Sequence, residues 1–164
     1  MIPVIGIIGY SGWGKTLLVE ALCAELTRRG RRVGTLKHDG HGHSYDRAGS
    51  DTWRHRRGGA AASVVFSGTG MALFGNGAGM ETALRCLEAC VPDLDLVILE
   101  GFSQGAHPCI LIGDEKRPQP PGRVLTTLPA LTGEGSLSSE TLARLAELIE
   151  GEAARQIAAT VPTG

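Results

Sequence analysis

The sequence has little of what marks a membrane, disulfide-bonded or nucleic-acid-binding protein. No run approaches the roughly 18 consecutive apolar residues of a membrane span, and the N-terminal residues lack the basic segment and cleavage site of a secretory signal. The four cysteines form no Cys-x-x-Cys pair. A net charge of −1 argues against nucleic acid as the main partner. We therefore expect a cytoplasmic protein without a membrane or nucleic-acid partner.

Aromatic side chains are also scarce, at 4% of the residues, whereas glycine is frequent, with 24 copies. Frequent glycine indicates tight turns and close backbone approaches. At 164 residues and 42% hydrophobic content, the chain is long enough for one well-buried core and too short for two ordinary domains. We expect a single domain over residues 1–164.

Strand-like and helix-like segments alternate along the chain. Residues 3–8 form a short apolar run, and apolar residues then recur at helical spacing from Lys15 to about Arg29. The strongest candidate for a buried strand is the segment 93–102, because it is continuously apolar from Leu96 to Leu99. Further strands are expected at 32–37, 62–67, 71–75, 109–113 and 123–128, and further helices at about 51–57, 80–90 and 138–150. The remaining segments are expected to be a loop at 38–50, a proline-rich linker at 116–122 and a weakly structured tail at 151–164.

This alternation predicts an α/β fold with a doubly wound, mostly parallel sheet flanked by helices. Ligands of such sheets bind at the carboxyl ends of the strands. The loops after residues 8, 37 and 100 should therefore converge.

The loop after the first predicted strand reads GYSGWGKT, residues 9–16, which matches the phosphate-loop pattern GxxxxGK[ST] in full. Its glycines allow backbone N–H groups to point at phosphate oxygens. Lys15 would reach the β- and γ-phosphates, and the Thr16 hydroxyl would bind Mg²⁺. Trp13 is expected to be an exposed spacer. The pattern predicts a P-loop NTPase fold whose nucleotide-binding residues are Gly9, Tyr10, Ser11, Gly12, Trp13, Gly14, Lys15, Thr16 and Leu17.

Two carboxylates are candidates for the same site. Glu100 emerges from the buried run LVILEGF, where a carboxylate would hold magnesium, and Asp39 follows the strand 32–37, where it would orient a water or bind the metal. Asp95 begins the Glu100 strand and is expected at the opposite end of the sheet. The predicted catalytic residues are therefore Lys15, Asp39 and Glu100, and the predicted metal ligands are Thr16, Asp39 and Glu100.

Two other functions stay open. Arg54, Arg56 and Arg57 are candidates for closing over phosphates in a small-molecule kinase. The second is a metal-delivery chaperone, since three histidines of the loop 38–50 have a spacing that suits a transition metal. These histidines are His38, His41 and His43.

The choice of base is also open. The usual guanine-reading motif Asn-Lys-x-Asp is absent, because the one Lys-x-Asp triplet of the sequence, Lys37-His38-Asp39, follows a leucine. Guanine and adenine cannot be distinguished from these residues.

Four segments resemble the molybdopterin-guanine dinucleotide biosynthesis protein B family in sequence and order: GYSGWGKT, VGTLKHD, DRAGSDTWRHRRGGA and DLDLVILEGF. The resemblance implies a homodimeric GTP-binding protein with weak GTPase activity, which assists the enzyme that attaches GMP to molybdopterin. It also implies phosphate binding by residues 9–16 and roles for Asp39 and Glu100 toward magnesium and water. Relatives have a strand ending in aspartate where this chain reads VLTTLP, so contacts to the base are expected from Thr126, Thr127 or the backbone.

Overall fold

The computed structural model describes residues 2–76, 79–113, 119–131 and 137–160. By its internal contacts the chain divides into two compact units, Met1–His38 with Leu87–Gly164, and Asp39–Cys86. The larger unit contains the parallel sheet, and the smaller one contains one helix, most of a second helix and a hairpin. The single domain expected over residues 1–164 stays a prediction. Residues 116–118 of the expected linker and 161–164 of the expected tail lie outside the described residues.

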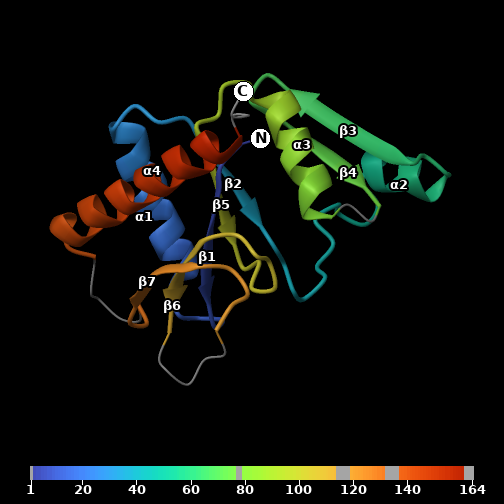
Figure 1. Ribbon diagram of the computed structural model, residues 1–164. Helices are drawn as coiled ribbons and strands as arrows, with labels where there is room; N and C mark the ends of the chain where they lie inside the picture. Colours follow the sequence, from blue (N-terminus) through green and yellow to red (C-terminus); the bar gives the residue numbers. More distant parts are fainter. Residues whose placement is uncertain (1, 77–78, 114–118, 132–136, 161–164) are drawn as a thin grey trace. The chain divides into compact units, whose positions relative to one another are not determined.

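The larger unit is built on a five-stranded parallel sheet with the strand order β2-β5-β1-β6-β7 (Figure 1). The predicted α/β fold, with a mostly parallel sheet flanked by helices, is thereby confirmed. Because β1, β2 and β5 are parallel neighbours, their carboxyl ends lie at one edge, and the loops after residues 9, 37 and 100 start there. The strands are β1 (Val4–Gly9), β2 (Val33–Lys37), β5 (Leu96–Glu100), β6 (Cys109–Ile112) and β7 (Val124–Leu128).

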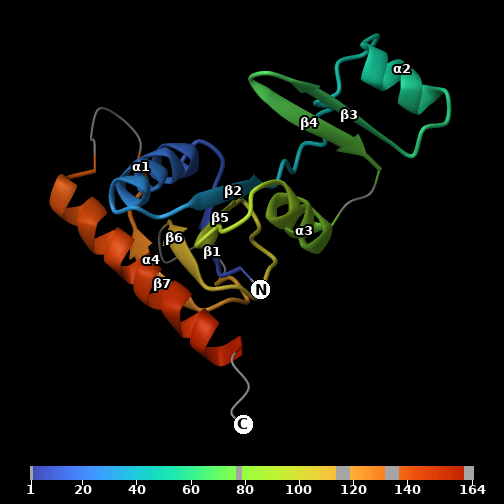
Figure 2. The same cartoon turned by 90° about the horizontal axis from the view of Figure 1, so that it is seen from above.

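Two helices, α1 (Lys15–Arg28) and α4 (Ser139–Thr160), lie on the same side of the sheet (Figure 2). Alternate residues of the central strands, such as Ile5 and Ile7 of β1, point to this side and are fully buried against both helices. The near-continuous apolar runs of these strands fit a sheet that is covered on both faces. This packing forms the main core and holds α1 against the sheet, directly after the loop that follows β1.

The other face of the sheet has a smaller core. Ile8, Cys109 and Leu111 are buried there beside Val124, and the helix α3 (Met80–Cys90) places Leu87 over Gly34, where a Cβ atom would lie 2.8 Å from the leucine side chain. The expected helix at 80–90 is confirmed with the same bounds.

His107 is buried on this second face, at 8% exposure, next to Gly6 of β1. A Cβ atom at Gly6 would lie 2.7 Å from the imidazole, so the glycine makes room for the ring. Within the described residues, neither ring nitrogen has a hydrogen-bond partner. The pKa of His107 is lowered because burial disfavours the charged imidazolium.

The expected end of the last helix near Glu150 is wrong, because α4 continues to Thr160. Tertiary contacts hold its second half: the buried Glu152 accepts a hydrogen bond from Arg123, and the Gln156 side chain bonds both the N–H and the C=O of Val4, at 3.0 Å each. These partners are about 30 and 150 residues away along the chain. Local sequence patterns therefore carried no signal of them. No helix within the described ranges is both long and apolar enough to cross a membrane.

The smaller unit contains the helix α2 (Asp51–Arg57) and two strands, β3 (Ala62–Ser67) and β4 (Gly70–Gly75). Ser50 caps the helix by accepting a hydrogen bond from the backbone N–H of Trp53 at 3.3 Å. Both strands were expected. Within the part of the chain that the structure describes, they pair with each other as an antiparallel hairpin and do not join the parallel sheet. One face of the hairpin is apolar and exposed, with Phe66 at 81% exposure. Its residues are Val64, Phe66, Met71 and Leu73.

Candidate functional site

The predicted phosphate loop joins the end of β1 to the start of α1. Gly12 and Gly14 have positive φ angles of 77° and 85°, which disfavour residues with a Cβ atom. Space is limited at Gly14, since a Cβ atom there would lie 2.7 Å from both the Cβ and the carbonyl oxygen of Leu131. Among the described residues no side chain caps the amino end of α1. The first N–H groups of an α-helix have no acceptor within the helix, so this end of α1 offers donors that suit an anion.

Trp13 does not lie exposed as expected. Its side chain is partly buried against the main core, its ring meets that of Tyr10 edge-on with 4.9 Å between centroids, and its carbonyl accepts a hydrogen bond from the N–H of Leu131 at 3.1 Å. The expectation of a spacer was wrong because Leu131, which anchors the loop from the segment after β7, cannot be identified from the loop's own sequence. Lys15 extends back over the loop and donates from Nζ to the carbonyl of Tyr10 at 2.8 Å.

Glu100 and Thr16 lie together as predicted. The Thr16 hydroxyl donates to Oε1 of Glu100 at 2.9 Å, and Glu100 is only 7% exposed at the end of β5. Because this hydrogen bond uses the hydroxyl hydrogen, the lone pairs of Thr16 Oγ1 are left to accept a donor or a cation. Gly101, with φ 89°, turns the chain directly after the carboxylate.

Lys37 also lies at this site, although it is not among the predicted site residues. Its Nζ lies 2.9 Å from Oε1 of Glu100 and 3.5 Å from Oγ1 of Thr16. The available signal was its position at the carboxyl end of the second predicted strand. Which side chain it would meet depends on the pairing of β2 with β5, and the sequence does not give that pairing.

Asp39 opens the smaller unit and organises the loop that follows it. The carboxylate accepts hydrogen bonds from the N–H of His41 at 2.9 Å, from the N–H and Nδ1 of His43 at 3.1 and 2.7 Å, and from the Tyr45 hydroxyl at 3.2 Å. These bonds, the one from the His41 backbone first, lower the pKa of Asp39 well below its usual value. Asp39 is therefore a carboxylate anion at neutral pH.

The structure also shows the contacts of residues that were candidates for the metal-delivery and kinase functions. Over the described ranges, no group of three or more His, Cys, Asp or Glu side chains is arranged to hold a metal ion. His38 lies 5.3 Å from the Phe102 ring in the larger unit. In the smaller unit, Arg56 pairs with the buried Asp46 at 3.1 Å, and Arg57 lies over the ring of Trp53 at 4.9 Å.

Two hollows adjoin the carboxyl ends of the strands in the larger unit. One, of about 320 Å³, lies beside Ile8, Tyr10 and Gln104. The other, of about 200 Å³, lies beside His38 and Phe102. The loop after Glu100 contributes Ser103 and Gln104 to both, so both adjoin segments next to the phosphate loop and Glu100.

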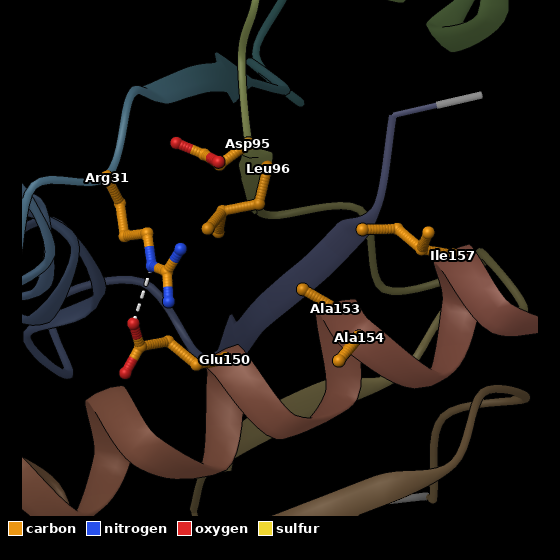
Figure 3. Close-up of a pocket in the computed structure, with 7 residues that line it drawn as sticks. All are labelled: Arg31, Asp95, Leu96, Glu150, Ala153, Ala154 and Ile157. Atoms are coloured by element: carbon orange, nitrogen blue, oxygen red, sulfur yellow. Dashed lines mark hydrogen bonds and ion pairs between the residues drawn. The ribbon is translucent and has the colours of Figure 1, made fainter.

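A third hollow, of about 110 Å³, lies near the amino end of β5 (Figure 3). An ion pair of 2.6 Å between Arg31 and Glu150 borders it, and Ala153, Ala154 and Ile157 line it from α4. Asp95, on its rim, accepts a hydrogen bond from the N–H of Arg32 at 2.7 Å. Asp95 thus lies at the opposite end of β5 from Glu100, as predicted.

A family model and two relatives that match this chain have names that refer to the same biosynthetic process. The family model described as molybdopterin guanine dinucleotide synthesis protein B matches residues 4–129. A Haemophilus influenzae protein named molybdopterin-guanine dinucleotide biosynthesis adapter protein is 33% identical over 122 residues, which are 73% of this chain and 67% of that protein. An Escherichia coli protein of the same name is 36% identical over 105 residues, which are 62% of this chain and 60% of that protein.

Solved structures agree with this match. A crystal structure of molybdopterin-guanine biosynthesis protein B superimposes with a TM-score of 0.63 at 26% identity, covering 92% of this chain and 99% of the other. The MobB structure of Bacillus subtilis has a TM-score of 0.67 with the same coverage, and its identity of 19% supports the shared fold alone.

Proposed function

Because this chain belongs to the molybdopterin guanine dinucleotide synthesis protein B family, we propose that it is an adapter protein in molybdopterin-guanine dinucleotide biosynthesis. In this proposal it binds GTP with Mg²⁺, hydrolyses it weakly and assists the enzyme that attaches GMP to molybdopterin. One observation carries the proposal: Thr16, the last residue of the phosphate loop, donates a hydrogen bond to the buried carboxylate of Glu100.

Phosphate binding is supported by the geometry of the loop and the helix behind it. The left-handed Gly12 and Gly14 allow the backbone to curve around an anion, and the start of α1, which no described side chain caps, adds N–H donors. Lys15 Nζ, within 2.8 Å of the Tyr10 carbonyl, lies over the same loop. Its ammonium would exchange that neutral acceptor for β- and γ-phosphate oxygens, which form stronger, charge-assisted hydrogen bonds.

Magnesium binding is supported by the chemistry of the donors. The Thr16 hydroxyl and Glu100 carboxylate supply the oxygen ligands that Mg²⁺ prefers, and Mg²⁺ commonly keeps several waters beside one or two carboxylates. Bound there, Mg²⁺ would neutralise charge on the phosphates. Asp39 is proposed as a further carboxylate toward the metal or the attacking water. Weak hydrolysis suits an adapter, since the nucleotide is then delivered intact.

A homodimer is part of the proposal. The apolar face formed by Val64, Phe66, Met71 and Leu73 supports it, because large exposed apolar patches commonly mark protein interfaces. Two-stranded hairpins are also marginally stable alone and gain from packing against a partner. Phe66→Ser should shift the dimer toward monomer in sedimentation, and an unchanged dimer would remove this face from the interface.

The central test is calorimetric titration with GTP and with ATP, each with Mg²⁺. We expect GTP to bind more tightly than ATP. Lys15→Ala should weaken GTP binding by about 1.5–3 kcal/mol, because it removes a charge-assisted hydrogen bond. The matched control is Arg144→Ala, which removes a positive charge from an exposed position on α4. Equal binding of GTP to the Lys15 variant and the control would refute the site.

The adapter role is tested separately with the purified nucleotidyl-transferring enzyme. We expect the two proteins to co-elute in gel filtration and GTP to tighten the complex. Tighter binding of ATP than of GTP would refute the guanine preference and leave the phosphate site in place. Failure to form a complex with that enzyme would refute the adapter role, independently of the nucleotide titration.

A further inference from the structure

Lys37 lies beside the two residues that the proposed function assigns to magnesium. Its Nζ is 2.9 Å from Oε1 of Glu100 and 3.5 Å from Oγ1 of Thr16, and the Thr16 hydroxyl donates to the same carboxylate oxygen. One carboxylate oxygen of a buried residue therefore receives two donors. Nothing in the sequence pattern of the phosphate loop requires a second lysine at this point.

The sheet itself fixes this arrangement. Lys37 is the last residue of β2 and is paired with Glu100, the last residue of β5. Directly paired residues of neighbouring parallel strands project from the same face, and Glu100 shares its face with Ile98, which packs in the core formed with α1. The backbone beyond the pair is also tied, since the N–H of His38 donates to the carbonyl of Glu100 at 2.9 Å. The ammonium of Lys37 is thus held on the α1 side of the sheet.

The side chains of the pair differ in exposure. The Glu100 side chain is 10% exposed, whereas that of Lys37 is 56% exposed. The lysine therefore approaches the carboxylate from solvent and covers its open side. A lysine keeps its charged end in water while its aliphatic stem lies along the protein, so the Lys37 ammonium is accessible to an anion that arrives from solvent.

We propose that Lys37 is a second phosphate-binding lysine, which contacts the terminal phosphate of a nucleoside triphosphate and makes the site distinguish a triphosphate from a diphosphate. This inference rests on the proposed function. Thr16 and Glu100 would hold Mg²⁺ beside the triphosphate, so an ammonium within reach of both residues would lie next to the terminal phosphate. Lys15 is the first residue of α1, directly after the loop that follows β1, and Lys37 is the last residue of β2, with β5 between the two strands. The two cations therefore approach the phosphates from different sides.

The exchange of partners at Lys37 is an exchange of hydrogen bonds only. The ammonium passes from the Glu100 carboxylate to a γ-phosphate oxygen, and Glu100 keeps the Thr16 hydroxyl as a donor and is left to hold the metal. A diphosphate has no γ-phosphate, so Lys37 keeps its contact with Glu100. The lysine then contributes to triphosphate binding alone.

The test compares GTP and GDP affinities of Lys37→Met, which removes the ammonium at nearly constant length, by calorimetry with Mg²⁺. We expect GTP binding to weaken about tenfold or more, as loss of a charge-assisted hydrogen bond predicts, and GDP binding to change less than about twofold. Lys37→Arg should restore most of the difference between the two nucleotides. Arg144→Met, on the exposed side of α4, is the control and should leave both affinities unchanged.

The ratio of GTP to GDP affinity decides the result. If Lys37 only neutralises Glu100, Lys37→Met should change both affinities equally, and an unchanged ratio overturns the inference. Thermal melting of each variant checks the fold, and Lys37→Gln gives the same readout if the Met variant does not fold. If the unsubstituted chain binds GTP and Lys15→Ala weakens that binding as predicted, while the GTP-to-GDP ratio is unchanged in the Lys37 variant, only this inference fails. If the unsubstituted chain binds neither nucleotide, the proposed function fails as well.

Discussion

Gly12 and Gly14 of the phosphate loop give a matched pair of substitutions. Both have left-handed backbones, with φ 77° and 85°. An alanine in this conformation costs roughly 1–2 kcal/mol at either position. The surroundings differ, because a Cβ atom at Gly12 meets nothing within 4 Å, whereas one at Gly14 would lie 2.7 Å from the carbonyl oxygen of Leu131.

Gly14→Ala therefore carries a second penalty. A backbone carbonyl cannot move away as the tip of a flexible side chain does, and strain from inserting an atom into a packed site is typically about 1–3 kcal/mol. We expect Gly12→Ala to destabilise by about 1–2 kcal/mol and Gly14→Ala by about 2–5 kcal/mol. In a chain of this size each kcal/mol lowers the melting temperature by about 2–4 °C.

Thermal and urea unfolding, followed by circular dichroism, measure both variants against the unsubstituted protein. We also expect Gly14→Ala to lose more GTP affinity, since the segment carrying Leu131 must move and the start of α1 moves with it. Equal destabilisation by the two substitutions would show that contact with Leu131 does not constrain the loop, and would refute the inference that Leu131 anchors it.

Three further predictions concern carboxylates and the buried histidine. Glu100→Gln should weaken the dependence of GTP binding on Mg²⁺, measured by titrating with and without the metal, and an unaltered metal response would exclude Glu100 from the site. The pKa of His107 is lowered by burial, so the unfolded chain binds the proton more readily and stability should fall as pH drops below 6.5; His107→Leu should flatten urea midpoints over that range, whereas the exposed control His55→Leu should not. Hydrogen bonds from Arg28 and Arg29 lower the pKa of Glu25 to about 2 from 4.5, so its stabilising effect is complete above 4.5 and lost as the pH falls through about 2. Glu25→Gln should accordingly be less stable than the unsubstituted protein at pH 7 and equal to it near pH 2, and a difference that persists in acid would contradict this reading.

Much of the local structure could be predicted because it depends on short-range patterns. The run from Leu96 to Leu99 identifies a buried strand since both faces of a central parallel strand are covered. The helix at 80–90 follows from apolar residues at helical spacing. Glycines in the loop likewise indicate tight turns, and Gly12 and Gly14 have the left-handed backbone conformation that few other residues adopt.

The pairing of the hairpin strands in the smaller unit could not be predicted from such local patterns. Residues 62–67 and 71–75 have the composition of strands wherever they pair, so the sequence alone does not place them outside the parallel sheet. The length of α4 is a second case. Its second half is held by Arg123 and Val4. Both residues lie far from the helix in the sequence, so a local pattern does not predict these contacts.

The sequence by itself determined that a glycine-rich turn with the phosphate-loop pattern follows the first strand, because GYSGWGKT places glycines at Gly12 and Gly14, where the backbone is left-handed. It also determined that a carboxylate ends a buried strand. Only the tertiary structure decided that Lys37 meets this carboxylate, and that Leu131 supports the loop. The physical reason is that strand order and register arise from packing between segments far apart in the chain, and these contacts leave no periodic trace in either segment.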